Sequence, residues 1–262
     1  MKLFMPKQHG AWAMLILPFW LGAAASDIIW SHIPFFLGWI LLYLATYPGL
    51  LLFKRKRMAF YAKWAIIYLV PAILLLLFPL LVRPSIIIFG LLMIPFFIIN
   101  ARYSSNNRDR ALGNDFSAIS AFSIAGLASS YLPHGEITPL AWTVFAASIS
   151  FFAGSTFYVK SMIREKKNIS FKWISWIFHA AVPILWLLAG GWIVSAAFLP
   201  SLFRSIAFYG KSFTPKKLGY MKLRMQPYSF SCYYLPFIIK DRPDQAGFLI
   251  YPEIAVLSIN KY

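Results

Sequence analysis

Eight runs of apolar residues, each about long enough to cross a lipid bilayer, fill most of the chain between Ala11 and Tyr209. A helix needs roughly 20 mostly apolar residues to span the hydrocarbon, because only a helix or a closed barrel satisfies its backbone there. The alternation of apolar and polar residues that marks a barrel strand is absent from these runs. The runs therefore predict an all-α fold, a polytopic transmembrane helix bundle.

We expect a single transmembrane helical domain over residues 1–219. Its predicted spans lie near 11–26, 33–53, 62–82, 85–100, 116–132, 140–160, 173–189 and 191–209, the fourth and fifth of them short. The composition agrees, since 60% of the residues are hydrophobic and 13% are charged, whereas a soluble domain carries about 25% charged residues.

The basic residues predict the orientation of the spans. Of the 25 Lys and Arg residues, 24 fall on one side of the expected topology and Arg83 stands alone on the other. Cytoplasmic loops retain Lys and Arg, so we expect both termini to be cytoplasmic. The formal net charge of +17 is then explained by contact with the lipid bilayer and its anionic headgroups, and we expect no nucleic-acid partner.

The segment 220–262 differs in character from the rest of the chain, because its apolar runs are too short to span. One interpretation is an atypical cytoplasmic tail. A second is that residues from about Tyr220 are out of frame, since Met221 to Pro236 can be encoded so that a shifted frame reads as an apolar helix. The intact parent would then have nine spans.

The loop between the fourth and fifth runs holds the densest group of polar residues. It carries Arg102, Arg108, Asp109, Arg110, Asn114 and Asp115. Guanidinium groups suit phosphate or carboxylate, whereas Asp109 and Asp115 are candidate ligands for Mg²⁺. The alternative is structural: the arginines anchor a helix at the headgroups, and Asn114 or Asp115 caps the fifth span.

Three further positions are candidates for ligand contact. Lys160 and Arg164 are four residues apart, so on a helix they share a face and either meet an anion or anchor the helix at the interface. His9 opens the first run and could contact a ligand or serve as a polar anchor. His179 lies within the seventh run, where an ionisable residue is either functional or bonded across helices, whereas His32 and His134 fall in outer loops and carry no signal.

Several motifs recur in an order that resembles the YwiC-like family of bacterial multi-pass membrane proteins. They are Pro6-Lys-Gln-His-Gly-Ala-Trp12, Asn100 with Arg108-Asp-Arg and Asn114-Asp115, Tyr158-Val-Lys160 with Ile163-Arg164-Glu165, and Thr214-Pro-Lys-Lys-Leu-Gly219. The resemblance covers residues 1 to about 219, implies a location in the bacterial cytoplasmic membrane, and supplies no activity.

Two hypotheses of different classes follow. The first is an enzyme, because the expected architecture is similar to that of UbiA-type prenyltransferases, which hold an isoprenoid diphosphate through Mg²⁺. Here Asp109 and Asp115, with Asn114, would hold the metal, and the nearby cations would neutralise diphosphate. The loop after the second run departs from that pattern, since it reads Lys54-Arg-Lys-Arg57 with no acid. The second hypothesis is a small-anion transporter, and an auxiliary membrane role is also open.

Overall fold

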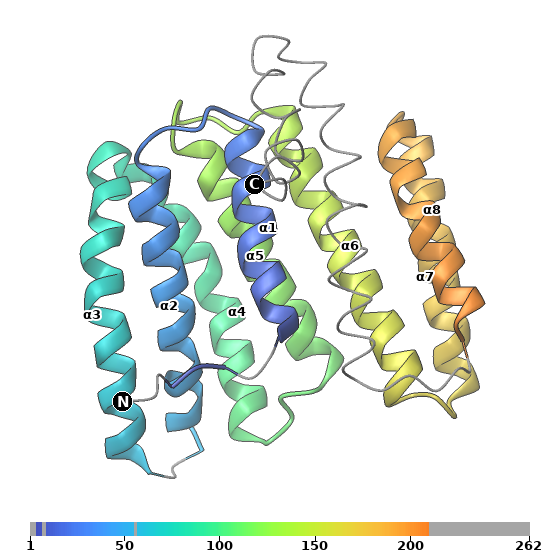
Figure 1. Ribbon diagram of the computed structural model, residues 1–262, viewed down its shortest axis with the longest axis horizontal. Coiled ribbons are helices and arrows are strands. Elements are labelled where there is room, and N and C mark those ends of the chain that lie inside the picture. Colours follow the sequence, from blue (N-terminus) through green and yellow to red (C-terminus); the bar gives the residue numbers. More distant parts are fainter. Residues whose placement is uncertain (1–3, 7–8, 55–56, 210–262) are drawn as a thin grey trace, which may run out of the picture. The chain divides into compact units, whose positions relative to one another are not determined.

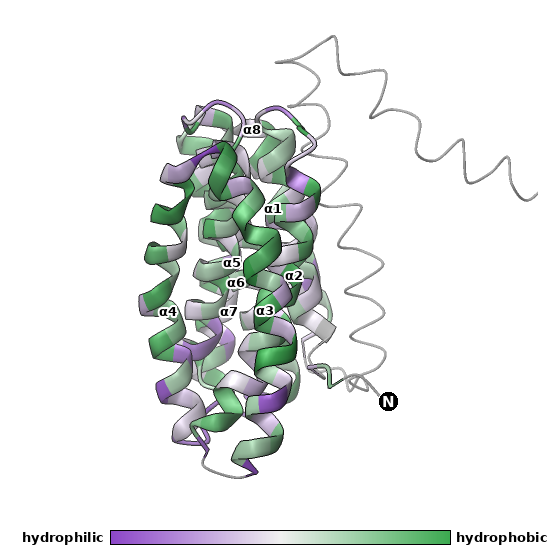
Figure 2. Cartoon of the chain, turned by 90° about the vertical axis from the view of Figure 1, so that its left-hand side faces the viewer, coloured by the Kyte–Doolittle hydropathy of each residue, from purple (hydrophilic) through white to green (hydrophobic). Residues whose placement is uncertain are grey.

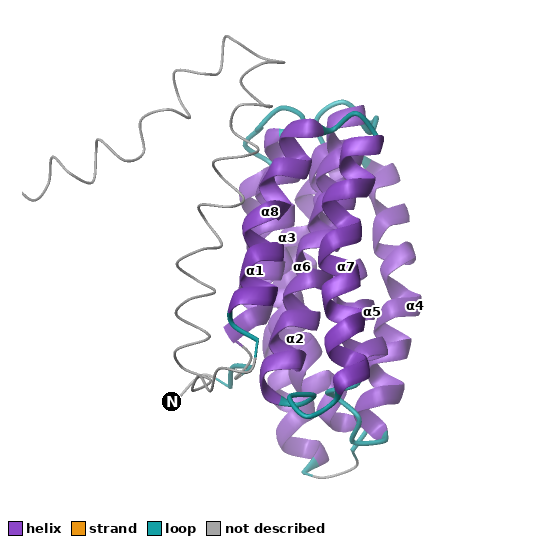
Figure 3. Cartoon of the chain, turned by 90° about the vertical axis from the view of Figure 1, so that its right-hand side faces the viewer, coloured by secondary structure: helices purple, strands orange, loops and turns teal. Residues whose placement is uncertain are grey.

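The computed structural model describes residues 4–6, 9–54 and 57–209, and these residues contain helices and no strand (Figures 1 and 3). The elements in chain order are α1 (His9–Ala24), α2 (His32–Leu52), α3 (Met58–Val82), the short 3-10 helix η1 (Pro84–Ile86), α4 (Ile87–Ser105), α5 (Leu112–Tyr131), α6 (Pro139–Ile163), α7 (Ile169–Leu188) and α8 (Trp192–Ala207). The predicted all-α fold is confirmed for the part described. The nine-span hypothesis concerns residues 210–262, which lie outside it.

The fourth and fifth helices are longer than the sequence predicted. α4 continues to Ser105, and α5 begins at Leu112, one turn before the expected start. Five helical segments are long and apolar enough to cross a membrane: α2, α3, η1 with α4, α6 and α7. The helices α1 and α8 are apolar but shorter, and α5 carries five serines.

The chain divides into two compact units, Met1–Thr156 and Phe157–Tyr262. In the first unit α2 packs along α3, and α5 packs along both α1 and α4. In the second unit α7 packs along α8. The pairs α2 with α3, α4 with α5, and α7 with α8 are sequential and antiparallel, joined by short loops. The helices α1 and α5 are not sequential, and they run in the same direction. The single domain over residues 1–219 stays a prediction.

Local signals explain where α7 begins and ends. The side chain of Asn168 accepts a hydrogen bond from the backbone N–H of Phe171 at 3.1 Å and so caps the helix. At the other end Gly190 adopts a φ of +79°, which glycine tolerates because it has no Cβ. The N–H of Gly191 then reaches the carbonyl of Trp186 at 2.9 Å, which satisfies an end carbonyl and turns the chain into α8.

The helices α1 and α5 cross at backbone contact distance. A Cβ placed on Gly22 would overlap the carbonyl oxygen of Gly126, and one placed on Gly126 would lie 2.5 Å from that of Pro18. No side chain larger than hydrogen fits between two backbones at this separation. Small residues at such a crossing let apolar helices gain van der Waals contact that larger residues would prevent.

Aromatic side chains fill the space between α1 and α2 beside this crossing. Phe19 is fully buried and its ring contacts those of Trp20, Phe35 and Phe36, with centroid distances of 5.0–5.6 Å. On the neighbouring contact, the ring of Trp39 on α2 meets that of Phe122 on α5 edge to face at 5.9 Å. Such pairs add to the area that the rings bury and fix the rotation of each helix about its axis.

Both units expose large apolar side chains along the length of their helices. Figure 2 shows how strongly apolar the residues of these helices are, with polar residues mainly toward their ends. On α3 the exposed apolar side chains include Ile66, Val70, Ile73, Leu77 and Leu81, and on α4 they include Ile87, Leu91, Ile94 and Ile98. On α7 and α8 they include Ile177, Ile184, Leu188, Leu199 and Phe203. Water-soluble monomers rarely expose contiguous apolar surface on this scale, so these helices are compatible with a bilayer environment.

The crossing of α1 and α5 yields a stability prediction. We expect Gly22→Ala and Gly126→Ala each to lower the melting temperature of the detergent-purified protein, because overpacking costs about 1–3 kcal/mol or more where backbone cannot yield. Gly49→Ala in α2 and Gly90→Ala in α4 are matched controls, since nothing lies within 4 Å of a Cβ placed at either position. There we expect no loss, or a gain of about 0.5–1 kcal/mol from helix propensity. Equal effects at all four glycines would refute the role assigned to the crossing.

Candidate functional site

The loops that follow α2 and α4 meet at one end of the first unit. The ammonium of Lys54 lies 2.7 Å from the carboxylate of Asp109, with side-chain exposures of 22% and 39%. An ion pair this exposed contributes about 0–1 kcal/mol to the free energy of unfolding. Its main effect is to hold the two loops together. The pairing also neutralises Asp109 within a group of cations.

The loop between α4 and α5 is a closed turn held by its own hydrogen bonds. The N–H of Arg108 donates to the carbonyl of Tyr103 at 2.8 Å, and the N–H of Ala111 donates to that of Arg108 at 3.0 Å. The side-chain amide of Asn114 donates to the backbone carbonyl of Asp109 at 2.8 Å. Arg108 is exposed on this turn, as are Arg102 in the last turn of α4 and Arg110 before α5.

The polar residues at the start of α5 have roles other than the capping that the sequence suggested. The residue that precedes the helix is Ala111, which offers no side-chain cap. Asn114 and Asp115 both lie in the first turn of the helix. The negative charge of Asp115 is favourable there, because the first backbone N–H groups of a helix have no partner within it. One turn further, the hydroxyl of Ser117 donates to the side-chain carbonyl of Asn100 at 2.6 Å and ties α5 to α4.

The acids of this loop do not gather with other metal-binding side chains. Within the described ranges, no group of three or more His, Cys, Asp or Glu residues could hold a metal ion. The carboxylate of Asp109 is already bound to Lys54. A magnesium ion would therefore depend on displacing Lys54 and on oxygen atoms from a ligand, and the assignment of Asp109 and Asp115 as metal ligands stays a prediction.

Lys160 and Arg164 are adjacent in the second unit but differ in burial, and the N–H of Arg164 donates to the carbonyl of Lys160 at 2.9 Å. Lys160, near the end of α6, is 8% exposed, whereas Arg164 follows the helix and is exposed. Lys160 thus lies in the interior and Arg164 at the surface. That both side chains face one anion stays a prediction. Neither is placed relative to the arginines of the first unit.

Tyr158 has a partner that sequence reasoning missed. The guanidinium of Arg204, in the last turn of α8, lies 4.4 Å from the centroid of the Tyr158 ring. Arg204 is 7% exposed and Tyr158 is 4% exposed. The sequence carried a signal for this contact, because Arg204 is the one charged residue in the last apolar run. An ionisable side chain inside such a run marks a candidate functional position.

A second cation at the same end of this unit lies among aromatic rings. The ammonium of Lys172 lies 4.3 Å from the ring centroid of Trp176 and 5.1 Å from that of Tyr209. The indole N–H of Trp176 donates to the carbonyl of Ser205 at 3.1 Å and joins α7 to α8 beside Arg204. Long cationic side chains over aromatic rings are typical of helix ends at a membrane interface.

The two histidines singled out from the sequence differ in what the structure describes. His9 is the first residue of α1, and its side chain lies outside the described part of the chain. His179 is buried in α7, and its Nδ1 lies 2.7 Å from the carbonyl oxygen of Ser175, one turn earlier. This bond is local to α7, and a functional role for His179 stays a prediction.

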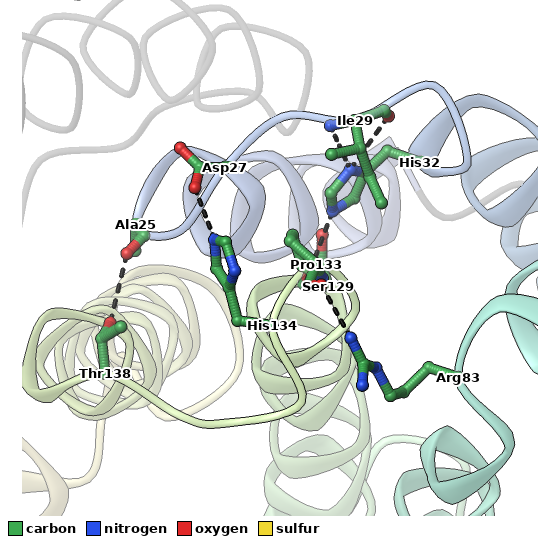
Figure 4. A network of polar contacts seen from close by, with 9 residues as sticks. All are labelled: Ala25, Asp27, Ile29, His32, Arg83, Ser129, Pro133, His134 and Thr138. Carbon is green, nitrogen blue, oxygen red and sulfur yellow. Dashed lines mark hydrogen bonds and ion pairs between the residues drawn. The ribbon is translucent and has the colours of Figure 1, made fainter.

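A separate polar network lies at the opposite end of the first unit (Figure 4). His32 is fully buried, and its Nε2 lies 2.9 Å from the carbonyl oxygen of Ser129. A proton on Nε2 lets it donate to that oxygen while Nδ1 accepts the N–H of Ile29 at 3.1 Å. Both ring nitrogens are thereby used in joining the start of α2 to the end of α5.

Two more contacts in this network join the remaining loops at that end. The imidazole of His134 pairs with the carboxylate of Asp27, and the guanidinium of Arg83 donates to the carbonyl of Pro133 at 2.8 Å (Figure 4). His32 and His134, for which no role was predicted, therefore both have structural ones. Arg83, the lone basic residue of this side, binds a backbone carbonyl and joins the loop after α3 to the loop after α5.

Comparisons with known proteins agree with the resemblance in the sequence. The family model described as YwiC-like protein matches residues 5–130, which run from the start of α1 to nearly the end of α5. The uncharacterised protein YwiC of Bacillus subtilis strain 168 is 41% identical over 224 residues, which are 85% of this chain and 93% of that protein. An uncharacterised protein of Haemophilus influenzae strain Rd is 34% identical over 220 residues, 84% of this chain and 92% of that protein.

No solved structure matches the chain. The two relatives each share more than 30% identity over most of both sequences, an extent that separates common descent from a shared apolar composition. The chain therefore belongs to the YwiC-like family.

Proposed function

We propose that this protein is a multi-pass protein of the bacterial cytoplasmic membrane, and that the turn between α4 and α5 binds a phosphate-bearing anion. One observation carries the proposal. Lys54 neutralises Asp109 at 2.7 Å. Arg102, in the last turn of α4, and Arg108, on the closed turn, are both exposed, and no acid is bound to either in the described part of the chain.

The membrane location is supported by the apolar surfaces of α3, α4, α7 and α8. The positions of the basic residues add support, because Lys54 and Asp109 join the loops after α2 and α4 at one end. Asp27, Arg83 and His134 join the intervening loops at the other end. This is the alternation of ends rich in Lys and Arg with ends poor in them that sets orientation in a membrane.

The chemistry of the turn favours an oxyanion. Guanidinium groups present several N–H donors in one plane and match the oxygens of phosphate or carboxylate. The start of α5 adds unpaired backbone N–H groups, because Ala111 offers no side-chain cap. Asp115 in the first turn of α5 opposes an anion, so the site is expected to need at least two of its arginines.

Membrane orientation gives the first prediction here. In a Cys232→Ser background, we expect Trp30→Cys and Ala189→Cys to react with a membrane-impermeant maleimide on intact bacterial cells. Asn106→Cys and Lys166→Cys should react only after lysis, since basic loops stay in the cytoplasm. All four positions are exposed. Labelling of Asn106→Cys on intact cells would reject the proposed orientation of the first unit, and labelling of Lys166→Cys would reject that of the second.

Anion binding gives a second prediction. Inorganic pyrophosphate should raise the melting temperature of the purified protein, since a ligand at a hundredfold excess over its Kd stabilises the folded state by about 2.7 kcal/mol. We expect the double variant Arg102→Gln with Arg108→Gln to lose most of this rise. Lys63→Gln, which removes an exposed cation from the first turns of α3, is the control and should keep it. An equal loss in both would indicate general screening of positive charge.

Removal of Asp109 separates simple anion binding from magnesium–diphosphate chemistry. If the site binds an anion directly, Asp109→Asn should leave the pyrophosphate response intact or strengthen it, because a negative charge is removed. The titration is repeated with a short polyprenyl diphosphate, with and without Mg²⁺. A response that requires Mg²⁺ and disappears in Asp109→Asn and in Asp115→Asn would contradict the direct site and favour prenyl transfer.

A further inference from the structure

Arg204 is a buried cation that has no counter-ion among the described residues. It is 7% exposed, and its Nε is buried without a hydrogen-bond partner in that part of the chain. The ion pairs of Lys54 with Asp109 and of His134 with Asp27 both lie in the first unit. Glu165 is the one acid in the described part of the second unit, and it accepts a hydrogen bond from Asn168.

The hydroxyl of Tyr158 is a second buried polar group beside Arg204. The guanidinium lies over the ring of Tyr158, and the Tyr158 hydroxyl is also buried without a hydrogen-bond partner among the described residues. Because the hydroxyl is on the edge of that same ring, the two buried donors belong to one small region between the ends of α6 and α8. Native proteins rarely leave two adjacent buried polar groups unsatisfied.

The contacts that Arg204 does make are too weak to offset its burial. Stacking on an aromatic ring and a place in the last turn of a helix are both favourable to a cation. The stabilisation from each of these contacts is much smaller than the free-energy cost of desolvating a charged group. Buried charges are therefore normally paired. The remaining stabilisation has to come from an anion that is not part of the described chain.

We propose that Arg204 and Tyr158 form a second oxyanion site, at the basic end of the second unit, which takes a phosphate group. A planar guanidinium and a neighbouring hydroxyl can donate to different oxygens of one phosphate. The two residues lie toward the ends of α6 and α8, at the height of lipid headgroups if these helices span the membrane as proposed above. The phosphate belongs either to a membrane lipid or to a soluble phosphate ester.

The site differs in kind from the turn between α4 and α5. Arg102 and Arg108 are exposed and would meet a ligand from solution, whereas Arg204 is enclosed and already oriented by the Tyr158 ring. An enclosed site of fixed geometry retains a ligand through purification better than an exposed one, because water competes less for its donors.

The experiment compares Arg204→Met with the wild-type protein, both exhaustively delipidated in phosphate-free detergent, first without an added anion and then with dioleoyl phosphatidylglycerol or inorganic phosphate. Without an anion, Arg204→Met should melt at the same temperature as wild type or higher, since an apolar side chain of similar length removes an uncompensated buried charge. With the phosphate source, protein that carries Arg102→Gln and Arg108→Gln should rise in melting temperature, because Arg204 is intact, and the same protein with Arg204→Met added should not. A response to the lipid alone identifies a headgroup, and one to inorganic phosphate identifies a soluble ligand.

Two further measurements complete the test. Tyr158→Phe tests the site without a change in the fold, and native mass spectrometry separates ligand at Arg204 from ligand at Arg102 and Arg108. Tyr158→Phe keeps the ring under Arg204 and should weaken apparent phosphate affinity by roughly tenfold, the effect of one hydrogen bond to a charged group. The double variant Arg102→Gln with Arg108→Gln should still retain a phosphate-bearing molecule, and it should retain fewer when Arg204→Lys is added. If all variants and wild type respond equally to both phosphate sources, or if Arg204→Met melts lower without any anion, the proposal is wrong.

Discussion

The crossing of α1 and α5 is the contact on which the first unit depends. Its backbones approach so closely that a Cβ on Gly22 would overlap the carbonyl of Gly126. Because α5 also packs along α4, and the Trp39 and Phe122 rings join it to α2, the position of α5 sets those of its neighbours. The turn that carries Arg108 precedes α5 directly, so its place in the unit follows from that crossing.

Charge is handled in three ways along this chain. At the end of the first unit that is poor in Lys and Arg, Arg83 binds a backbone carbonyl and joins two loops. At its basic end, Lys54 binds Asp109 and the neighbouring arginines remain at the surface, where water solvates them and a ligand from solution could reach them. In the second unit, Arg204 has exchanged water for the aromatic face of Tyr158. The two proposed anion sites rest on the second and third of these arrangements.

The sequence by itself determined the helical class, the order of the helices and the loops that carry charge. These depend on run length and on the presence or absence of Lys and Arg, which are local properties. It also placed the candidate residues of the turn after α4, although the start of α5 at Leu112 turned Asn114 and Asp115 from loop or cap residues into part of the helix.

Only the tertiary structure decided which polar residues meet. Lys54 and Asp109 are 55 residues apart in the sequence, and Tyr158 meets Arg204 from a different helix. Pairings of this kind depend on how each helix is rotated about its axis. A helix that is apolar on every side gives no periodic signal of which face points inward, so that rotation is set by contacts such as Gly22 on Gly126, which arise only when the helices pack.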